Sequence, residues 1–137
     1  MPGTWKAPSP GDLVWCHFPD SPAVTPGPKP RPALVVAVVT HEDGVVVHVV
    51  HGTSQRVDRL KAGEFAILKA NNPSAFALAG LAFDTKFDFK VVLELPWTEP
   101  FFKVPPRAPQ GQTPKLGTLH PSLIRAAKAA YDAAASR

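Results

Sequence analysis

The sequence predicts a mainly β protein, in which short strands form a small, strongly curved antiparallel sheet or barrel closed by one C-terminal α-helix. Three observations support this fold class. Apolar, often β-branched runs recur at short intervals, turn residues separate them, and a helical spacing of apolar residues begins only at residue 121. At 137 residues the chain has the length of one domain, so we expect a single domain over residues 1–137.

The first thirty residues combine one strand with two proline-rich segments. Residues 1–10 are expected to form an N-terminal arm, and the apolar run Leu13–Phe18 is predicted to be a strand. Residues 19–30 are predicted to be a loop, because closely spaced prolines lack the N–H donors of a sheet and break a helix. Long ordered loops are also implied by the 17 prolines of the chain.

A β-hairpin is predicted next. Ala33–Thr40 and Val45–His51 are almost wholly apolar, and the intervening His41–Gly44 contains Asp-Gly, a strong hairpin signal. Residues 55–62 alternate basic and apolar side chains, which indicates a solvated strand or loop. These two runs are therefore predicted to be the second and third strands of the sheet.

The second half of the chain is expected to hold further strands. Glu64–Lys69 and roughly Leu78–Asp84 are predicted to be short strands, and Pro73 between them is suited to start one helical turn. Phe87–Leu95 alternates apolar and charged residues, the period of a half-buried strand. These strands would complete a sheet of five or six members.

A long irregular segment and a helix complete the chain. Residues 96–118 are rich in proline and aromatic residues and are expected to form either a packed Ω-like loop or a partner-binding flap. Residues 121–136 show helical spacing of apolar residues after Pro121, which suits a first helical position. A single C-terminal helix is therefore expected to close the predicted sheet or barrel.

The composition of the chain indicates which class of partner and which cellular compartment to expect. The formal net charge is +4 and the isoelectric point is about 9.5, which favours a polyanionic partner. The single Cys16 excludes an internal disulfide and a cysteine-based zinc site, and it fits a reducing cytoplasm. No apolar run approaches the roughly 20 residues that span a bilayer, so we expect no membrane partner.

Two short motifs mark a candidate anion site. Arg31 stands between two prolines, which restrict the backbone and hold the guanidinium where a loop becomes a strand. Lys29 lies two residues earlier, and residues 52–55, with the sequence Gly52, Thr53, Ser54 and Gln55, end the predicted hairpin. These hydroxyl and amide groups either bind a substrate or satisfy the backbone of their own turn.

These motifs, in their order and spacing, resemble the MazF/PemK family of toxin endoribonucleases. The opening Gly11-Asp12 before an apolar strand, the Arg31-Pro32 pair that starts the second strand, and Thr53-Ser54-Gln55 at the end of the third are similar to the family pattern. The resemblance covers about the first 60 residues, and the C-terminal helix fits as well. It implies an SH3-like barrel, usually a homodimer, that cleaves single-stranded RNA without a metal or cofactor.

The resemblance also implies roles for individual residues. Arg31 and Thr53 would stand at the family's arginine and threonine, where a guanidinium fork can hold two phosphate oxygens while the hydroxyl donates to the same group. Gly52 would let the backbone approach the substrate closely, and Gln55 would contact a base edge or a phosphate. Growth inhibition by such a toxin would be blocked by a cognate antitoxin protein.

Metal-free RNA cleavage uses the substrate's own 2′-hydroxyl as the nucleophile. Three residues are candidates for the general base that removes the proton of this hydroxyl. His51 shares a strand face with Thr53, because side chains alternate along a strand, and imidazoles change charge near neutral pH. Asp84 is a candidate through the Arg-x-Asp motif that some PemK-type members carry in a later strand, and His17 at the end of the first strand is a third. Each histidine is also readily explained as a structural residue.

The sequence departs from the family at that Arg-x-Asp motif. The corresponding stretch is Ala82-Phe83-Asp84, which keeps the aspartate and lacks the arginine, and Lys86 is a candidate substitute. The missing arginine leaves a second function open, a non-catalytic binding module on the same barrel that grips a nucleic acid or a host protein. Such a module would suit a phage or another mobile element.

Overall fold

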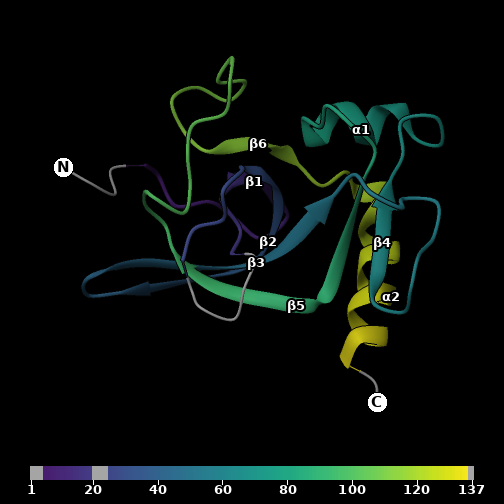
Figure 1. Ribbon diagram of the computed structural model, residues 1–137, viewed down its shortest axis with the longest axis horizontal. Coiled ribbons are helices and arrows are strands. Elements are labelled where there is room, and N and C mark those ends of the chain that lie inside the picture. The colour runs from purple at the N-terminus through teal and green to yellow at the C-terminus, as the bar shows by residue number, and fades with distance from the viewer. Residues whose placement is uncertain (1–4, 20–24, 136–137) are drawn as a thin grey trace.

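One antiparallel sheet forms the centre of the molecule. The structure, a computed structural model, describes residues 5–19 and 25–135. Within them, six strands pair in the order β4-β5-β3-β2-β1-β6 and every neighbouring pair is antiparallel. The sheet curves strongly, with the C-terminal helix beside β4 (Figure 1), so the predicted mainly β, barrel-like class is confirmed. The strands are β1 (Asp12–Cys16), β2 (Arg31–His41), β3 (Gly44–Thr53), β4 (Glu64–Ile67), β5 (Thr85–Pro96) and β6 (Lys115–Thr118).

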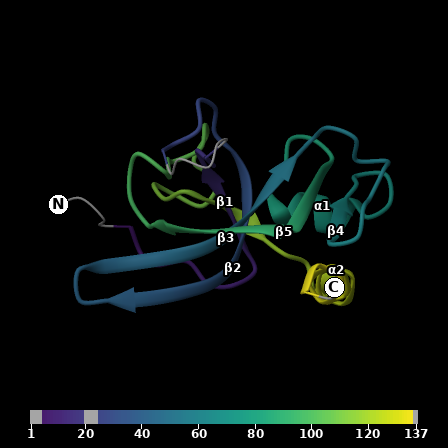
Figure 2. The ribbon, with the colours of Figure 1, turned by 60° about the horizontal axis from the view of Figure 1, so that its bottom comes forward.

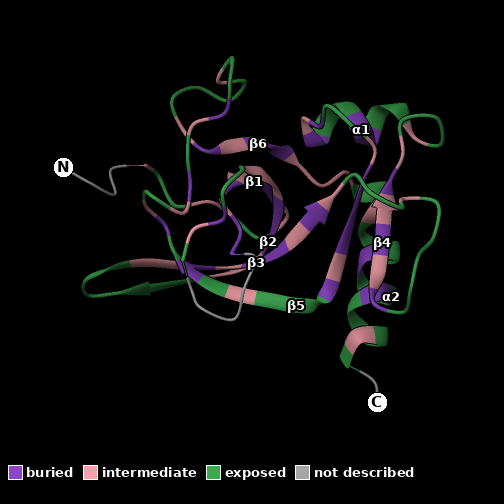
Figure 3. Ribbon diagram, viewed as in Figure 1, coloured by how far each residue is buried: buried purple, intermediate pink, exposed green. Residues whose placement is uncertain are grey.

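The predicted hairpin is confirmed as β2 and β3. Val35 pairs with Val49 and His41 with Gly44, which leaves a turn at residues 42–43. The β-branched residues of both strands pack well on a pleated surface and favour this pairing. The hairpin projects from the body of the sheet (Figure 2), and its tip is exposed (Figure 3).

Apolar side chains are buried on both faces of the sheet. In β1, Leu13 belongs to a cluster with Phe65 and Phe87, whereas the next residue, Val14, belongs to a second cluster with Phe102. Successive side chains of a strand point to opposite faces, so a strand buried on both sides must be apolar throughout. This explains the uninterrupted apolar run of the first strand, which ends two residues earlier than predicted.

The predicted strand at residues 78–84 is wrong. Residues Pro73–Ala79 form helix α1, which begins after Asn72, whose side-chain oxygen accepts a hydrogen bond of 3.1 Å from the Ala75 amide. Gly80 ends the helix in the left-handed conformation at φ 72°, as helix C-caps commonly do. The cap at Asn72 and the terminus at Gly80 therefore set the bounds of a short helix, which buries Ala75, Phe76 and Ala79, and the rest of the predicted strand connects this helix to β5.

The segment at residues 96–118 is more ordered than predicted. β5 extends to Pro96, and β6 pairs with β1 at the other end, so only residues 97–114, here called the 97–114 loop, connect them. Phe102 is fully buried and its ring lies 4.8 Å from that of Trp97. The loop therefore contributes to the core instead of standing away from it.

A helix covers the sheet at the C-terminal end. A 3₁₀ turn at Pro121–Leu123 leads into α2 (Ile124–Ala135), which packs on β4 and β5 through Ala127 and Ala130. The helix agrees with the predicted range up to residue 135, and residue 136 lies outside the described residues, as do residues 1–4 of the predicted arm and 20–24 of the predicted loop. Among the helices of the described chain, none is both long and apolar enough to cross a membrane.

Candidate functional site

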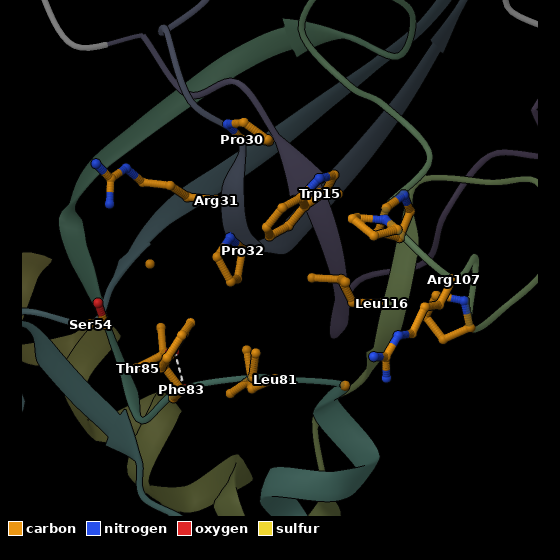
Figure 4. Close-up of a pocket in the computed structure, with 16 residues that line it drawn as sticks. Trp15, Pro30, Arg31, Pro32, Ser54, Leu81, Phe83, Thr85, Arg107 and Leu116 are labelled. Carbon is orange, nitrogen blue, oxygen red and sulfur yellow. Dashed lines mark hydrogen bonds between the residues drawn. The ribbon is translucent and has the colours of Figure 1, made fainter.

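A pocket of about 600 Å³ opens where the start of β2 meets the end of β3. Figure 4 shows its side chains, which converge from β1, β2, the connection between α1 and β5, β6 and the 97–114 loop. The volume is that of a small-ligand site, and most of the lining is apolar. The pocket is lined by Trp15, Pro30, Arg31, Pro32, Gly52, Ser54, Gly80, Leu81, Ala82, Phe83, Thr85, Pro105, Pro106, Arg107, Pro109 and Leu116.

Arg31 lies at the edge of this pocket and at the point where a loop becomes a strand, as its place between two prolines predicts for the backbone. It is the first residue of β2, pairs with Cys16 of β1, and is half-buried. No ion pair involves Arg31 within the described part of the chain. In Figure 4 its side chain extends along one side of the pocket, above Ser54. Its guanidinium is therefore available to an anionic ligand.

The residues predicted to work with Arg31 fall on the two faces of β3. Gly52 and Ser54 line the pocket, whereas His51 and Thr53 alternate with them and point to the opposite face. Ala33 pairs with His51, so Arg31, two residues before Ala33, shares the face of His51 and Thr53. Arg31 also lies at the pocket edge, so it is placed beside the pocket as well as on the strand face of His51 and Thr53.

Gly52 has a clear packing role. A Cβ atom at this position would lie 2.7 Å from Cε1 of Phe87, 2.7 Å from the carbonyl oxygen of Pro32 and 2.9 Å from Cγ2 of Thr85. All three contacts are shorter than normal van der Waals separations. The absence of a side chain therefore lets β2 and β5 close against β3 beneath the pocket.

Thr53 and Gln55 form part of a turn at the end of β3. The Thr53 hydroxyl oxygen accepts a hydrogen bond of 3.2 Å from the Gln55 amide, a common arrangement of turn hydroxyls. Ser54, Gln55 and Lys29 are exposed, and of these only Ser54 lines the pocket. The Thr53 hydroxyl can still donate its proton to a ligand while it accepts this bond.

The three candidate bases each contact a different part of the fold. The ring of His51 packs against Phe18 at 4.9 Å, Asp84 accepts a hydrogen bond of 2.8 Å from the Lys69 amide, and Nδ1 of His17 lies 2.8 Å from the Gly27 carbonyl oxygen. His51 is the candidate that shares a strand face with Thr53. The pocket lining, all of it from the described residues, includes no histidine and no carboxylate.

Lys86 is engaged inside the fold. Its ammonium group donates to Oε1 of Glu64 at 3.1 Å and to the Arg59 carbonyl oxygen at 3.0 Å, and only 7% of the residue is exposed. Burial by itself would raise the pKa of Glu64, but a backbone bond from Lys61 and the hydrogen bond and charge of Lys86 lower it. Lys86 would have to leave both partners to reach a ligand.

Cys16 is a buried structural residue. It is fully buried in the second apolar cluster, and this burial raises the pKa of its thiol to about 12. A thiol that stays protonated at neutral pH is a poor nucleophile. Cys16 therefore acts as a small apolar residue of the core.

Two pocket residues were not singled out from the sequence. Arg107, on the 97–114 loop, lies on the opposite side of the pocket from Arg31 (Figure 4), and Phe83 lies at the pocket with 71% of its surface exposed. Phe83 belongs to the Ala82-Phe83-Asp84 stretch, where only the aspartate was considered. Arg107 gave no signal beyond its charge, because only the tertiary structure brings its loop to β2.

Comparisons with known proteins bear on the fold. No protein-family model matches this sequence, and no curated protein sequence matches it. Among solved structures, the chain is similar to an endoribonuclease from Mycobacterial species, with a TM-score of 0.56 and 16% sequence identity, over 96% of this chain and 94% of that chain. At this identity the likeness establishes a shared fold that extends over nearly the whole of both chains.

Proposed function

We propose that this protein is an endoribonuclease that cleaves single-stranded RNA without a metal, by attack of the substrate's own 2′-hydroxyl. The observation that carries the proposal is Arg31, a guanidinium with no described ion-pair partner, at the edge of an apolar pocket. The shared fold with a protein that is called an endoribonuclease supports it. The net charge of +4 favours a polyanion.

The chemistry requires three groups. The 2′-oxygen bonds to phosphorus as the bond to the 5′-oxygen breaks, and the leaving 5′-oxygen takes a proton from water, which leaves a 2′,3′-cyclic phosphate and a 5′-hydroxyl end. Arg31 stabilises the charge on the phosphoryl oxygens, and Thr53, on the same face, donates its hydroxyl to the phosphate. His51 takes the proton from the 2′-hydroxyl, because it shares this face and imidazoles exchange protons near neutral pH.

The biological role follows from the resemblance to the MazF/PemK family. We propose a cytoplasmic toxin that inhibits growth by cutting RNA, that forms a homodimer, and that a cognate antitoxin protein inhibits. The Arg31-Pro32 and Thr53-Ser54-Gln55 motifs, at the start of β2 and across the end of β3, support this reading.

The test is to incubate the protein with a long single-stranded RNA in EDTA and to map the ends of the products. We expect cleavage with cyclic phosphate ends, and a loss of about 100-fold or more for Arg31→Ala, as for other groups that stabilise transition-state charge. Arg125→Ala is the matched control, because Arg125 is exposed on α2 and lies outside the pocket. Equal cleavage by Arg31→Ala and the control would refute the catalytic role.

A second candidate function is a binding module without catalysis. It is favoured by the pocket lining, which holds two arginines and no proton acceptor of the histidine or carboxylate type among the residues described. A protein that binds single-stranded RNA in a salt-dependent manner but leaves it intact at high protein excess would establish this alternative. Salt-insensitive capture of a protein would point to a protein partner instead.

A further inference from the structure

Arg107 belongs to the 97–114 loop, which forms backbone hydrogen bonds to one pocket residue, Trp15, on either side of Arg107. The Lys103 amide donates to the Trp15 carbonyl oxygen at 3.3 Å, and the Trp15 amide donates to the Pro114 carbonyl oxygen at 2.8 Å. Trp15 itself lines the pocket. Between these anchors, the Ala108 amide closes a turn on the Pro105 carbonyl oxygen at 3.0 Å. The 97–114 loop therefore presents Arg107 at a defined position.

The backbone of Arg107 adopts a conformation that its residue type disfavours. Its φ angle is 71°, in the left-handed region that glycine occupies readily and that costs other residues roughly 1 kcal/mol or more. The side chain is exposed and forms no ion pair with the described residues. Neither packing nor charge pairing accounts for an arginine here, and such outliers are concentrated at functional sites.

The charges of the pocket define its ligand. Arg31 and Arg107 are the charged residues among those that line it, and they approach from opposite sides (Figure 4). Between them lie apolar side chains, among them Trp15, Leu81 and Phe83. Two cations that flank an apolar surface are complementary to a ligand with two anionic groups and a flat apolar body between them. A stretch of single-stranded nucleic acid has this form.

We propose that Arg107 binds a second phosphate of the RNA strand whose reacting phosphate Arg31 holds, so that the 97–114 loop forms the second wall of the substrate site. This inference rests on the proposed function and assigns its second phosphate contact. The nucleotide between the two phosphates lies over the apolar surface. Arg107 thus supplies, from another part of the chain, a positive charge that the Ala82-Phe83-Asp84 stretch lacks.

The test measures binding of a labelled single-stranded oligonucleotide pool of random sequence, with 2′-deoxy sugars so that it is not cleaved. Arg107→Gly removes the cation and suits the left-handed backbone, so the variant keeps its fold, which a thermal melt checks. Lys103→Ala is the control, because it removes one charge from the same loop outside the pocket. The third protein is Arg107→Gly with Ala82→Arg, which returns a guanidinium to the pocket wall.

We expect Arg107→Gly to weaken binding roughly tenfold at low salt and to reduce the slope of log affinity against log salt by about 0.7, the value for one phosphate contact on a single strand. Lys103→Ala should keep the wild-type slope. Adding Ala82→Arg to the Arg107→Gly protein should restore that slope. Equal effects of Arg107→Gly and Lys103→Ala would overturn the proposal.

A parallel cleavage assay separates this proposal from the proposed function. RNA cleavage that depends on Arg31 and is unchanged in Arg107→Gly, with unchanged binding, overturns the role of Arg107 and leaves the nuclease standing. Wild-type protein that neither binds nor cleaves single strands refutes both. Arg31-dependent cleavage that weakens in Arg107→Gly and recovers with Ala82→Arg supports both.

Discussion

At the scale of single residues, the surroundings of each cation decide what it can bind. Lys86 is nearly buried, and its ammonium group donates hydrogen bonds to Glu64 and to a backbone carbonyl oxygen, so its charge is balanced by the carboxylate within the fold. Arg31 and Arg107 stand at the pocket and form no ion pair with the residues described. The sequence marks Arg31 through its flanking prolines, whereas only the tertiary structure distinguishes Lys86 from Arg107.

Lys86→Met should destabilise the protein by about 3 kcal/mol at neutral pH, because it leaves the Glu64 carboxylate buried without its cation. Urea denaturation measures the change. Lys86→Met with Glu64→Gln is the control, and it should recover much of the loss because no charge is stranded. A loss of ribonuclease activity in Lys86→Met without a loss of stability would instead make Lys86 a substrate contact.

The same pair predicts the direction of the pH dependence. The folded protein holds the pKa of Glu64 below its ordinary value, so the ionised carboxylate favours the folded state. This contribution is present above the ordinary carboxyl pKa of about 4.3 and is lost as the pH falls through the lower folded value. Chemical denaturation should therefore show that the free energy of unfolding of the wild-type protein declines as the pH falls. The double variant Lys86→Met with Glu64→Gln should show a smaller decline over the same pH range.

Phe83→Ala should weaken binding of single-stranded RNA by about 1–3 kcal/mol, the range for loss of one base–aromatic stack. With 71% of its surface exposed at the pocket, the ring contributes little to folding, so we expect stability to change by no more than about 0.5 kcal/mol. Fluorescence anisotropy and a thermal melt measure the two effects. Leu78→Ala, at an exposed leucine of α1 outside the pocket, is the control.

At the scale of elements, the sequence predicts correctly those strands and helices that are stabilised by contacts between residues close together in the chain. The β2–β3 hairpin follows from two β-branched runs and a short turn, and it forms where predicted. Helix α1 was predicted only as a turn at Pro73, because its Asn72 cap and its Gly80 terminus lie among residues that also suit strand ends. β6 gave no strand signal, since its four residues become a strand only through pairing with β1.

Gly52→Ala should destabilise the protein by about 1–3 kcal/mol, because the added methyl group would overlap Phe87 and the Pro32 carbonyl group, and the latter belongs to a paired strand. Denaturation by urea checks this value, with Ser54→Ala, at the exposed position two residues later, as the neutral control. Unchanged stability with lost RNA binding would mean that Gly52 serves the ligand and not the packing.

At the scale of the whole molecule, one sheet separates two apolar clusters and holds them together. Adjacent residues of β1, Leu13 and Val14, are both fully buried, one in each cluster. Trp15 packs at the first cluster and Trp97 lies in the second. The strands connect both clusters covalently, so neither can lose its packing without disturbing the other.

We therefore expect a single unfolding transition in which far-ultraviolet circular dichroism and tryptophan fluorescence coincide. Leu13→Ala and Val14→Ala should each lower the unfolding midpoint, Leu13→Ala through a loss of about 2–5 kcal/mol in the free energy of unfolding, while the two probes continue to agree. Trp15→Phe leaves Trp97, which lies in the second cluster, and Trp5, which packs against it, to report on that cluster. If this variant showed separate transitions for secondary structure and fluorescence, the chain would have to be regarded as two folding units.

The sequence alone specifies the mainly β class, the hairpin, the C-terminal helix and the place of Arg31, because these depend on residues close together in the chain. The tertiary structure decides the rest of the site. Pairing of β6 with β1 and the burial of Phe102 bring the 97–114 loop to the pocket, where Arg107 faces Arg31 across it. Arg31 and Arg107 are distant in sequence, and no local pattern predicts that they line one pocket, because only the folded sheet and its loops bring both of them there.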